Sequence, residues 1–354
     1  MSDEQMTFGF ANEPPSAETL PPTRLARAAW VADRVQSLAK RGVYIGTSSW
    51  KYPGWLGQVY DPGRYAIRGR LSERKFRNDC LAEYATVFPT VCGDFAFYQF
   101  PTDEMWQGIF ERLPAGYKFA LKVPDVVTME RFPRQPRYGE RAGEVNRDFM
   151  NPQLVRALLL DRLEPFRDKL GPVIFEFTAI HNSDLCQPAN FADALDRMLA
   201  QLPCERFEMA VEVRNPQFLP KADERNDAGT RRRGDAAKER DSGSPYLEVL
   251  RRHNVAHVLN SWTRMPPVYE QMRMPGIFTA THVVSRWLLK PGRTYAQAVE
   301  AFSPYETTKD PYPEGRQALR ELIEQFVPDE RVFYAFVNNR FEGSAIETIE
   351  GVLE

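Results

Sequence analysis

Short apolar runs that end in polar residues recur along the chain. Eight such runs occur, namely VYIGTSSW (43–50), TVCGDFAFY (90–98), KFALKV (118–123), PVIFEF (172–177), EMAVEVRN (208–215), HVLNSW (257–262), FTATHVVSRW (278–287) and RVFYAFVNNR (331–340). Most of them are separated by stretches long enough to hold a helix. Eight buried strands that alternate with helices predict an α/β fold, a TIM (β/α)8 barrel. The polar ends of the strands then lie at the C-terminal mouth, where barrel enzymes keep their chemistry.

The segments between the strands predict the helices. They are expected over 71–88, 103–112, 152–169, 190–201, 245–253, near 268, over 314–326 and at the C-terminal SAIETIEGVLE. A helix over 23–40, with Thr23 as its N-cap, precedes the first strand and is expected to cap one end of the barrel. The pattern therefore predicts a single barrel domain over 22–354.

Two segments have compositions typical of disorder. Residues 1–21 are rich in Pro and polar residues, and 221–244 carry mixed charge with almost no apolar side chains. Neither segment can bury enough apolar surface to fold by itself. We expect a disordered N-terminal tail and a solvated insertion in the barrel.

Composition limits the function classes. The 354 residues are 43% hydrophobic, which supplies a large core, and the formal net charge of -2 removes the usual electrostatic argument for broad nucleic-acid or membrane binding. No apolar run is long enough to cross a bilayer, and the N-terminus lacks the pattern of a signal peptide. The four cysteines are widely spaced without a CxxC pair, as in a cytoplasmic protein with free thiols. A monomer is favoured over an oligomer.

Strand alternation brings charged residues together at the predicted mouth. In KFALKV, Ala120 and Lys122 share one face, and the same parity turns Glu176, Glu212 and Arg214 inward on the next two strands. Buried charges are costly unless they are paired. Two interpretations follow: a functional site with Glu212 as base or nucleophile, Glu176 as its acidic partner and Lys122 beside them, or a salt-bridge network that only fills the barrel.

Further polar and aromatic residues stand at other strand ends and are candidates for substrate binding. They are Arg286, Asn338, Asn339, Asp94, Ser48, Trp50 and Tyr98. Cations bind anionic groups, carboxamides offer donors and acceptors, and aromatic faces suit a sugar ring or a nucleobase. The ligand is expected to be small and polar and to carry phosphate or carboxylate, because the cations outnumber the anions of the site.

Several motifs are missing. The four histidines have no HxH or HExxH spacing, so a zinc site is not predicted, although a carboxylate site would still suit magnesium. There is no GxSxG elbow, no P-loop and no GxGxxG after the first strand. The sequence therefore predicts no cofactor.

At these same positions the chain resembles the YecE-like proteins, a family catalogued as domain of unknown function 72. The resemblance covers roughly 43–353 through short motifs in a fixed order: Gly46-Thr47-Ser48 with Trp50, Tyr52, Trp55 and Tyr60; Tyr84, Phe88, Thr90-Val91, Phe97-Tyr98 and Pro101; Lys118-Phe119, Lys122 and Thr128; Leu170-Gly171-Pro172, Glu212, Arg214, Arg286, Asn338-Asn339, Gly343 and Ala345. It implies a TIM barrel with a polar central cavity and no established reaction.

The chain departs from the family pattern at several positions. Cys92 and Asp94 stand where the family usually has Glu and Asn, Met129 and Arg340 where it usually has His, and Glu176 where it usually has Gln. These departures put His-dependent chemistry in doubt and would make a two-carboxylate mechanism special to this chain.

Two function hypotheses follow from the sequence. The first is a hydrolase or lyase that uses acid/base chemistry on a phosphorylated, carboxylated or sugar-like substrate. The second is a non-catalytic binding module, associated with single-stranded nucleic acid through aromatics near Trp50 and the segment 124–151. Whether the chain is an enzyme stays open at this point.

Overall fold

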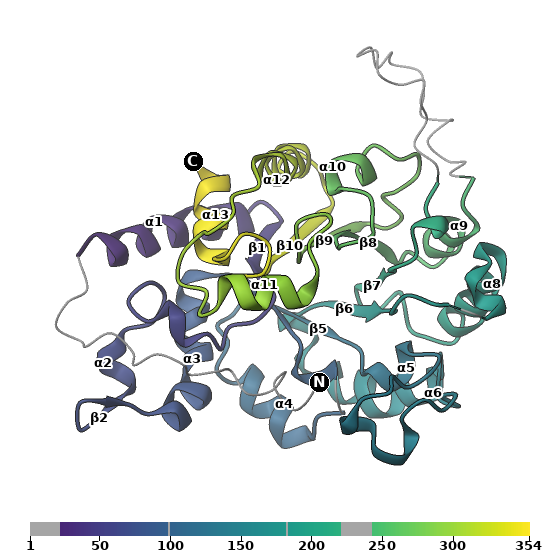
Figure 1. Ribbon diagram of the computed structural model, residues 1–354, viewed down its shortest axis with the longest axis horizontal. Coiled ribbons are helices and arrows are strands. Elements are labelled where there is room, and N and C mark those ends of the chain that lie inside the picture. The colour runs from purple at the N-terminus through teal and green to yellow at the C-terminus, as the bar shows by residue number, and fades with distance from the viewer. Residues whose placement is uncertain (1–21, 98–99, 182, 221–242) are drawn as a thin grey trace, which may run out of the picture.

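The computed structural model describes residues 22–97, 100–181, 183–220 and 243–354, without the side chains of 22–26 and 137 (Figure 1). The predicted tail over 1–21, residues 221–242 of the predicted insertion over 221–244, and Tyr98 lie outside the described residues. None of the described helices is long and apolar enough to span a membrane.

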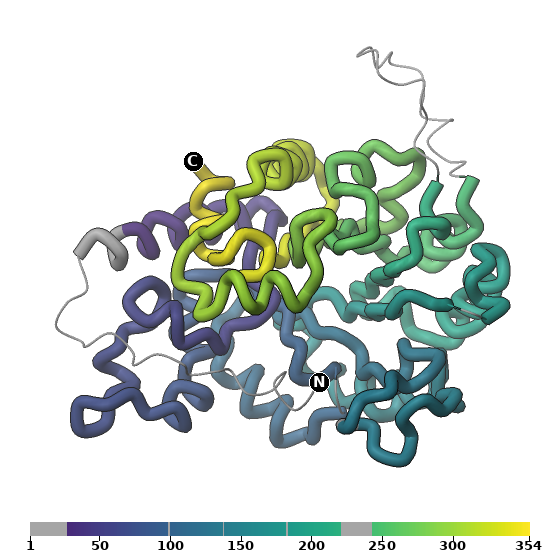
Figure 2. Tube along the Cα trace, in the orientation of Figure 1, coloured from purple at the N-terminus to yellow at the C-terminus, as the bar shows by residue number. Residues whose placement is uncertain are grey.

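Eight parallel strands form a closed barrel, which confirms the predicted TIM barrel. They are joined in the order β1-β10-β9-β8-β7-β6-β5-β4. Each overlaps one of the eight apolar runs: β1 (Val43–Thr47), β4 (Thr90–Gly93), β5 (Lys118–Lys122), β6 (Leu170–Glu176), β7 (Met209–Glu212), β8 (Ala256–Ser261), β9 (His282–Trp287) and β10 (Val332–Val337). The first and last strands lie side by side (Figure 2), so the two ends of the chain close the barrel.

The helices surround this barrel. They are α1 (Pro22–Ala39), α2 (Pro62–Tyr65), α3 (Glu73–Val87), α4 (Asp103–Phe110), α5 (Asp125–Thr128), α6 (Pro152–Val155), α7 (Asp161–Leu163), α8 (Pro188–Leu199), α9 (Pro245–Arg252), α10 (Val268–Gln271), α11 (Tyr295–Phe302), α12 (Pro313–Phe326) and α13 (Ala345–Leu353). The described part of α1 packs against β1, α3 and α13. A short hairpin, β2 (Ala66–Ile67) with β3 (Arg70–Leu71), lies in the connection between β1 and α3.

Three details differ from the expected elements. The second strand ends at Gly93 instead of continuing to residue 98, because Phe95–Phe97 turn into a 3-10 helix. The helix expected over 152–169 is divided into α6, a π-helical turn (Arg156–Leu160), α7 and a 3-10 segment (Glu164–Lys169). Pro165 accounts for the last break, since proline has no N–H to continue an α-helix. The helix α11 was not expected.

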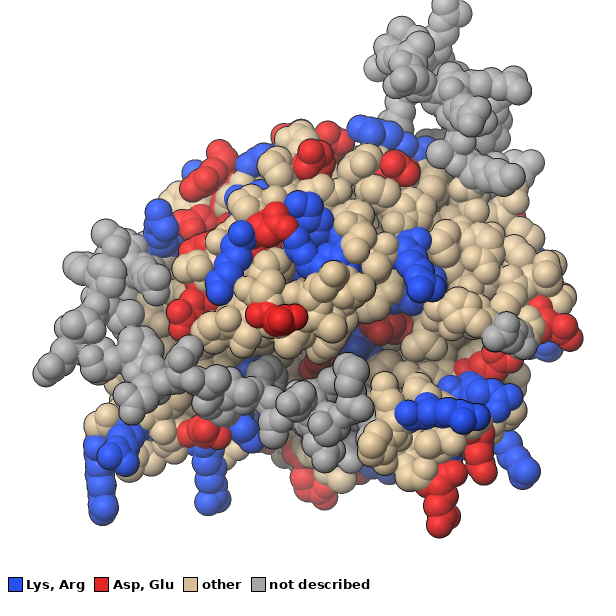
Figure 3. All heavy atoms as spheres, viewed as in Figure 1, with Lys and Arg blue, Asp and Glu red and all other residues tan. Residues whose placement is uncertain are grey.

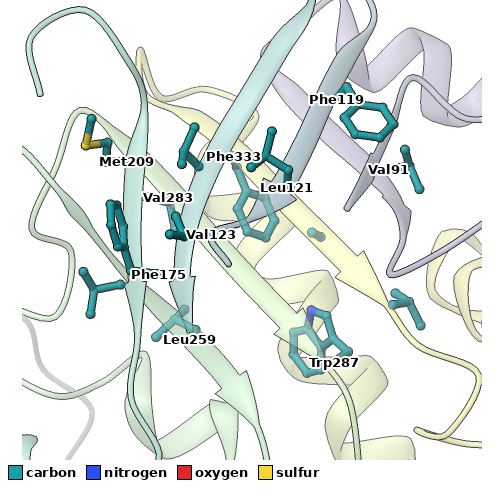
Figure 4. Packing of buried hydrophobic residues seen from close by; sticks show 14 of the residues in the cluster. Val91, Phe119, Leu121, Val123, Phe175, Met209, Leu259, Val283, Trp287 and Phe333 are labelled. Carbon is teal, nitrogen blue, oxygen red and sulfur yellow. The ribbon is translucent and has the colours of Figure 1, made fainter. Parts of the chain in front are cut away.

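Alternate residues of each strand face two different cores. Cys92, Ala120, Ile174, Ala210 and Val284 belong to an apolar cluster that fills the barrel. Their strand neighbours pack outward beneath the helices, and Figure 4 shows this outer core with Phe119, Leu121, Phe175, Met209 and Val283 among its members. The alternation is the one predicted for a strand buried on both faces. It also fixes which residues point into the barrel near its mouth.

On its other side β1 pairs with β4, the next barrel strand along the chain, through the single register pair Thr47 and Val91. At this seam a Cβ on Gly46 would lie 2.0 Å from the carbonyl oxygen of Thr90, so only glycine fits the close approach. The hydroxyl of Tyr84 accepts from the Thr47 backbone N–H at 3.0 Å and donates to the Thr90 carbonyl at 3.1 Å. A buried tyrosine therefore ties the seam together.

Candidate functional site

A layer of charged side chains lies above the apolar filling of the barrel. Lys122, Glu176 and Glu212 are the last residues of β5, β6 and β7, and Arg286 is the last but one of β9. Glu176 and Glu212 are register partners on neighbouring strands. Arg214 follows two residues after β7. The structure thus brings together the four residues that strand parity placed at the mouth and Arg286, the further cation predicted at a strand end.

Both carboxylates are shared between the same two guanidinium groups. Nη1 of Arg286 donates to Oε2 of Glu176 at 2.5 Å and also to Oε2 of Glu212. Nη2 of Arg214 lies 2.6 Å from Oε1 of Glu212 and 3.5 Å from Oε1 of Glu176. Nζ of Lys122 lies 3.6 Å from Oε2 of Glu176. We call these five residues the mouth cluster.

The mouth cluster is almost removed from water. The side chain of Glu212 is fully buried, those of Arg214 and Arg286 are 6% and 5% exposed, and that of Glu176, the most exposed of the five, reaches 14%. Three cations stand against two carboxylates, and no third carboxylate of the described residues joins them in an ion pair. The cluster therefore buries an excess of positive charge, which is costly unless an anion neutralises it.

Electrostatics fixes the protonation states in the cluster. Burial acts to raise the pKa of Glu176, but the charges of Lys122, Arg286 and Arg214 outweigh it and hold that pKa well below its usual range. Burial acts to lower the pKa of Arg286, and the two glutamates reverse this and raise it. Below the cluster, burial raises the pKa of the Cys92 thiol to about 11. Glu176 is thus held ionised, and Cys92 is held as the neutral thiol.

Several polar atoms at the mouth have no hydrogen-bond partner among the described residues although they are buried. They include Nη1 of Arg214, Nε of Arg286, Oδ1 of Asn260 and Oγ of Ser48. Buried donors and acceptors are nearly always satisfied in folded proteins, by the protein, by water or by a ligand. Buried polar atoms without partners, next to an excess positive charge, are typical of a binding site for a polar ligand.

Aromatic rings support the cations from the side. The guanidinium carbon of Arg214 lies 3.8 Å from the centre of the Trp262 ring, and Nζ of Lys122 lies 4.0 Å from the centre of the Phe97 ring. Both distances suit cation–π contacts. These rings hold the two cations in place without neutralising their charge.

Asn338 and Asn339 directly follow β10, but their side-chain oxygens accept hydrogen bonds from backbone N–H groups. Oδ1 of Asn338 accepts from the N–H of Arg340 at 2.9 Å, and Oδ1 of Asn339 accepts from the N–H of Ala345 at 2.8 Å. Nδ2 of Asn339 is buried without a partner among the described residues. The pair shapes the loop before α13, and its amide donors are the groups left for a ligand.

The remaining predicted residues are placed differently. Trp50 is 4% exposed and packs edge-on with Phe95 and Phe119, their ring centres 6.2 and 5.7 Å from its own. It belongs to the outer core, so its ring is not free to stack on a base or sugar. Asp94 is half-buried. Burial acts to lower the pKa of Arg340, and the charge of Asp94 is among the effects that reverse this and raise it.

Sequence reasoning missed Asn260 and Trp262. Asn260 is fully buried at the end of β8, in register with Arg286, and its Nδ2 donates to the Val213 carbonyl at 3.2 Å. The alternation used on the other strands, applied to HVLNSW, turns Asn260 inward and would have found it. Trp262 lies beyond the strand, where no periodicity predicts its contact with Arg214.

No group of three His, Cys, Asp or Glu among the described residues is arranged to hold a metal ion. The two glutamates of the mouth cluster are engaged by arginines, whose positive charges oppose a cation there. The donor set at the mouth therefore suits an anion better than a metal.

A closed parallel barrel with charged residues at the C-terminal ends of its strands defines a TIM-barrel protein. A family model described as "Protein of unknown function DUF72" matches residues 44–354. The chain therefore belongs to the DUF72 family, which is the YecE-like family that the sequence motifs resemble.

The solved structures similar to this chain include two DUF72 family proteins. A DUF72 family protein from Enterococcus faecalis is 14% identical with a TM-score of 0.54, over 88% of this chain and 95% of that one. Another from Thermotoga maritima is 19% identical with a TM-score of 0.53, over 88% and 97%. No curated protein matches the chain. At these identities the likeness bears on the fold alone.

Proposed function

We propose that the mouth of the barrel binds a small anionic ligand that carries a phosphate or carboxylate. The excess of one positive charge in the buried mouth cluster carries this proposal. A phosphate or carboxylate would neutralise that charge and accept from the unpartnered Nη1 of Arg214. A cluster that served only as barrel filling would be expected to balance its charges.

The geometry of the mouth cluster favours binding of an anion, or stabilisation of a negative charge that develops during a reaction. It does not favour a hydrolase mechanism in which two carboxylates act as acid and base. A glycosidase keeps the space between its carboxyl groups for the glycosidic bond. Here Nη1 of Arg286 occupies that space and bonds both glutamates. Glu176, with its pKa far below the usual range, holds no proton to donate near neutral pH. If a hydrolase or lyase reaction takes place, Glu212 is the candidate base and the cations stabilise the anion that forms.

The proposal is tested by the melting temperature of the protein with a panel of small anions at constant ionic strength. Phosphate, a phosphorylated sugar and a dicarboxylate are each compared with chloride, and an uncharged sugar serves as a control. A ligand that binds only the folded chain raises the melting temperature. We expect a rise with phosphate or carboxylate and none with an uncharged sugar. Equal melting temperatures in all solutions, chloride included, would overturn the proposal.

A further inference from the structure

A second concentration of positive charge lies outside the barrel, in the connection between β1 and α3. Residues 64–77 contain six basic side chains and one acidic one, whereas the whole chain has a net charge of -2. All six are exposed: Arg64, Arg68, Arg70, Arg74, Lys75 and Arg77. Figure 3 shows long Lys and Arg side chains projecting at the lower left, where Figure 1 labels α2 and β2. We call residues 64–77 the basic hairpin.

Most of these cations are not neutralised by neighbouring carboxylates. Arg77 pairs with Glu73 at 3.4 Å and Arg64 lies 4.0 Å from Glu83. The other four form no ion pair with any described residue.

The acidic residues Asp61 and Glu83 near the basic hairpin accept hydrogen bonds from the surrounding chain. Asp61 caps α2 by accepting from the N–H of Gly63 at 2.8 Å. Glu83 accepts from the N–H of Asp61 at 2.8 Å and from the hydroxyl of Tyr65 at 2.5 Å. The positive charge is therefore left facing solvent.

The basic hairpin is rigidly mounted. Tyr60, Tyr65 and Phe76 are buried and meet in pairs as T-shaped contacts, with ring centres 5.1 to 6.2 Å apart. The N–H of Ser72 also donates to the Tyr65 carbonyl at 2.8 Å. A fixed array of cations loses less conformational freedom on binding than a flexible tail does.

The turn of the hairpin places a further cation at its tip. Arg68 and Gly69 form a two-residue turn with φ of 52° and +76°. Both values lie in the left-handed region, where Asn-Gly is the preferred pair and a long side chain is uncommon. Arginine at the first position puts a cation at the tip at the expense of the better turn former.

We propose that the basic hairpin binds the phosphate backbone of nucleic acid, a role that does not rest on the function proposed for the mouth. Five of its six cations are arginines, whose planar guanidinium groups match phosphate oxygens in pairs. An anionic membrane is the other extended array of phosphates. The hairpin offers such a surface a single largely exposed apolar side chain, Ile67 at 54%, with no apolar face beside it.

The experiment is fluorescence anisotropy of a labelled single-stranded oligonucleotide, titrated with the full chain between about 50 and 200 mM salt, where backbone binding is steeply salt-dependent. The wild type should bind with an affinity that falls linearly on a log–log plot as salt rises. The variant Arg68→Gln, Arg70→Gln, Arg74→Gln should bind at least about tenfold more weakly, with a slope shallower by about 2, since each lost phosphate contact removes roughly 0.7.

A matched control removes three exposed cations from other elements by the changes Lys40→Gln, Arg156→Gln and Arg197→Gln. It should bind like the wild type. If the triple hairpin variant fails to fold, Arg74→Gln with Lys75→Gln, which leaves the turn intact, replaces it. The proposal is overturned if the control weakens binding as much as the hairpin variant does. It is also overturned if the wild type ignores the oligonucleotide, whether or not it binds vesicles containing phosphatidylserine.

Discussion

Arg286 on β9 reaches Glu176 on β6 at 2.5 Å, although β7 and β8 lie between these strands in the sheet. The contact therefore crosses the inside of the barrel rather than running along its wall. The same nitrogen of Arg286 also holds Glu212. One guanidinium thus joins three strands at the mouth, and any change to the charge balance there should affect both stability and ligand binding.

Replacing Glu212 by Gln should destabilise the protein. The change leaves Arg214 and Arg286 sharing one remaining carboxylate in a buried site. Breaking a buried ion pair in this way costs about 3–5 kcal/mol. Urea unfolding of the variant against the wild type measures the loss. The exposed Glu73→Gln, which breaks only a surface pair with Arg77, is the control and should change stability by less than about 1 kcal/mol.

The same variant should respond more strongly to phosphate than the wild type does. Glu212→Gln raises the excess positive charge of the mouth cluster, so an anion there becomes more favourable. The rise in melting temperature on adding phosphate should be larger for the variant than for the wild type. An equal or smaller rise would count against an anion site at the mouth.

Acid should destabilise the wild type partly through Glu176. Its pKa in the folded chain lies well below the value of about 4.3 expected in the unfolded chain. As the pH falls through about 4, Glu176 becomes protonated in the unfolded chain but stays ionised in the folded chain. The free energy of unfolding therefore decreases with falling pH until the pKa of Glu176 in the folded chain is reached.

The variant Glu176→Gln lacks this pH-dependent contribution to stability, because glutamine does not titrate. Urea midpoints measured at neutral pH and near pH 4 should therefore differ less in the variant than in the wild type. Glu73→Gln should keep the wild-type difference. A variant with the full acid sensitivity of the wild type would show that Glu176 is not held ionised by its neighbours.

The cysteines should differ sharply in reactivity. Burial raises the pKa of Cys92 to about 11 and those of Cys80 and Cys204 to about 12, whereas Cys186 is only half-buried. The thiolate is the reactive form. A disulfide reagent added to the native protein should therefore label one thiol rapidly, and Cys186→Ser should remove that fast phase. Rapid labelling that persists in this variant would contradict the burial of the other three.

Much of the fold was predictable because strand burial leaves a strong pattern. KFALKV and EMAVEVRN alternate between small or charged inward residues and large outward ones, and this parity placed Lys122 and Glu212 correctly inside the barrel. The same parity in PVIFEF placed Glu176 beside them. The helix α11 was harder to find, because it follows the turn formers Pro291 and Gly292, which indicate a loop. The π-helical turn over Arg156–Leu160 has no sequence signature of its own.

The sequence could predict which residues belong to the site, but it could not predict which of these residues contact one another. Side-chain parity says that a residue points inward, and it does not say which partner lies across the barrel. The bridge from Arg286 to Glu176 depends on barrel curvature and stagger, which no local pattern records. Trp50 shows the same limit: its position after a strand end made it a candidate for stacking on a ligand, and no local pattern recorded that its ring packs in the outer core.

The central claim is that the excess cation of the mouth cluster binds an anion, and calorimetric titration of phosphate into Lys122→Gln tests it most directly. This change balances the cluster at two cations and two carboxylates without touching the arginine bridges. Lys118→Gln is the matched control, because Lys118 lies on the same face of β5 at its other end and donates to the Asp168 carbonyl. We predict that phosphate binds the wild type and Lys118→Gln alike and that Lys122→Gln loses it. Undiminished binding by Lys122→Gln, or no binding by the wild type, would contradict the account.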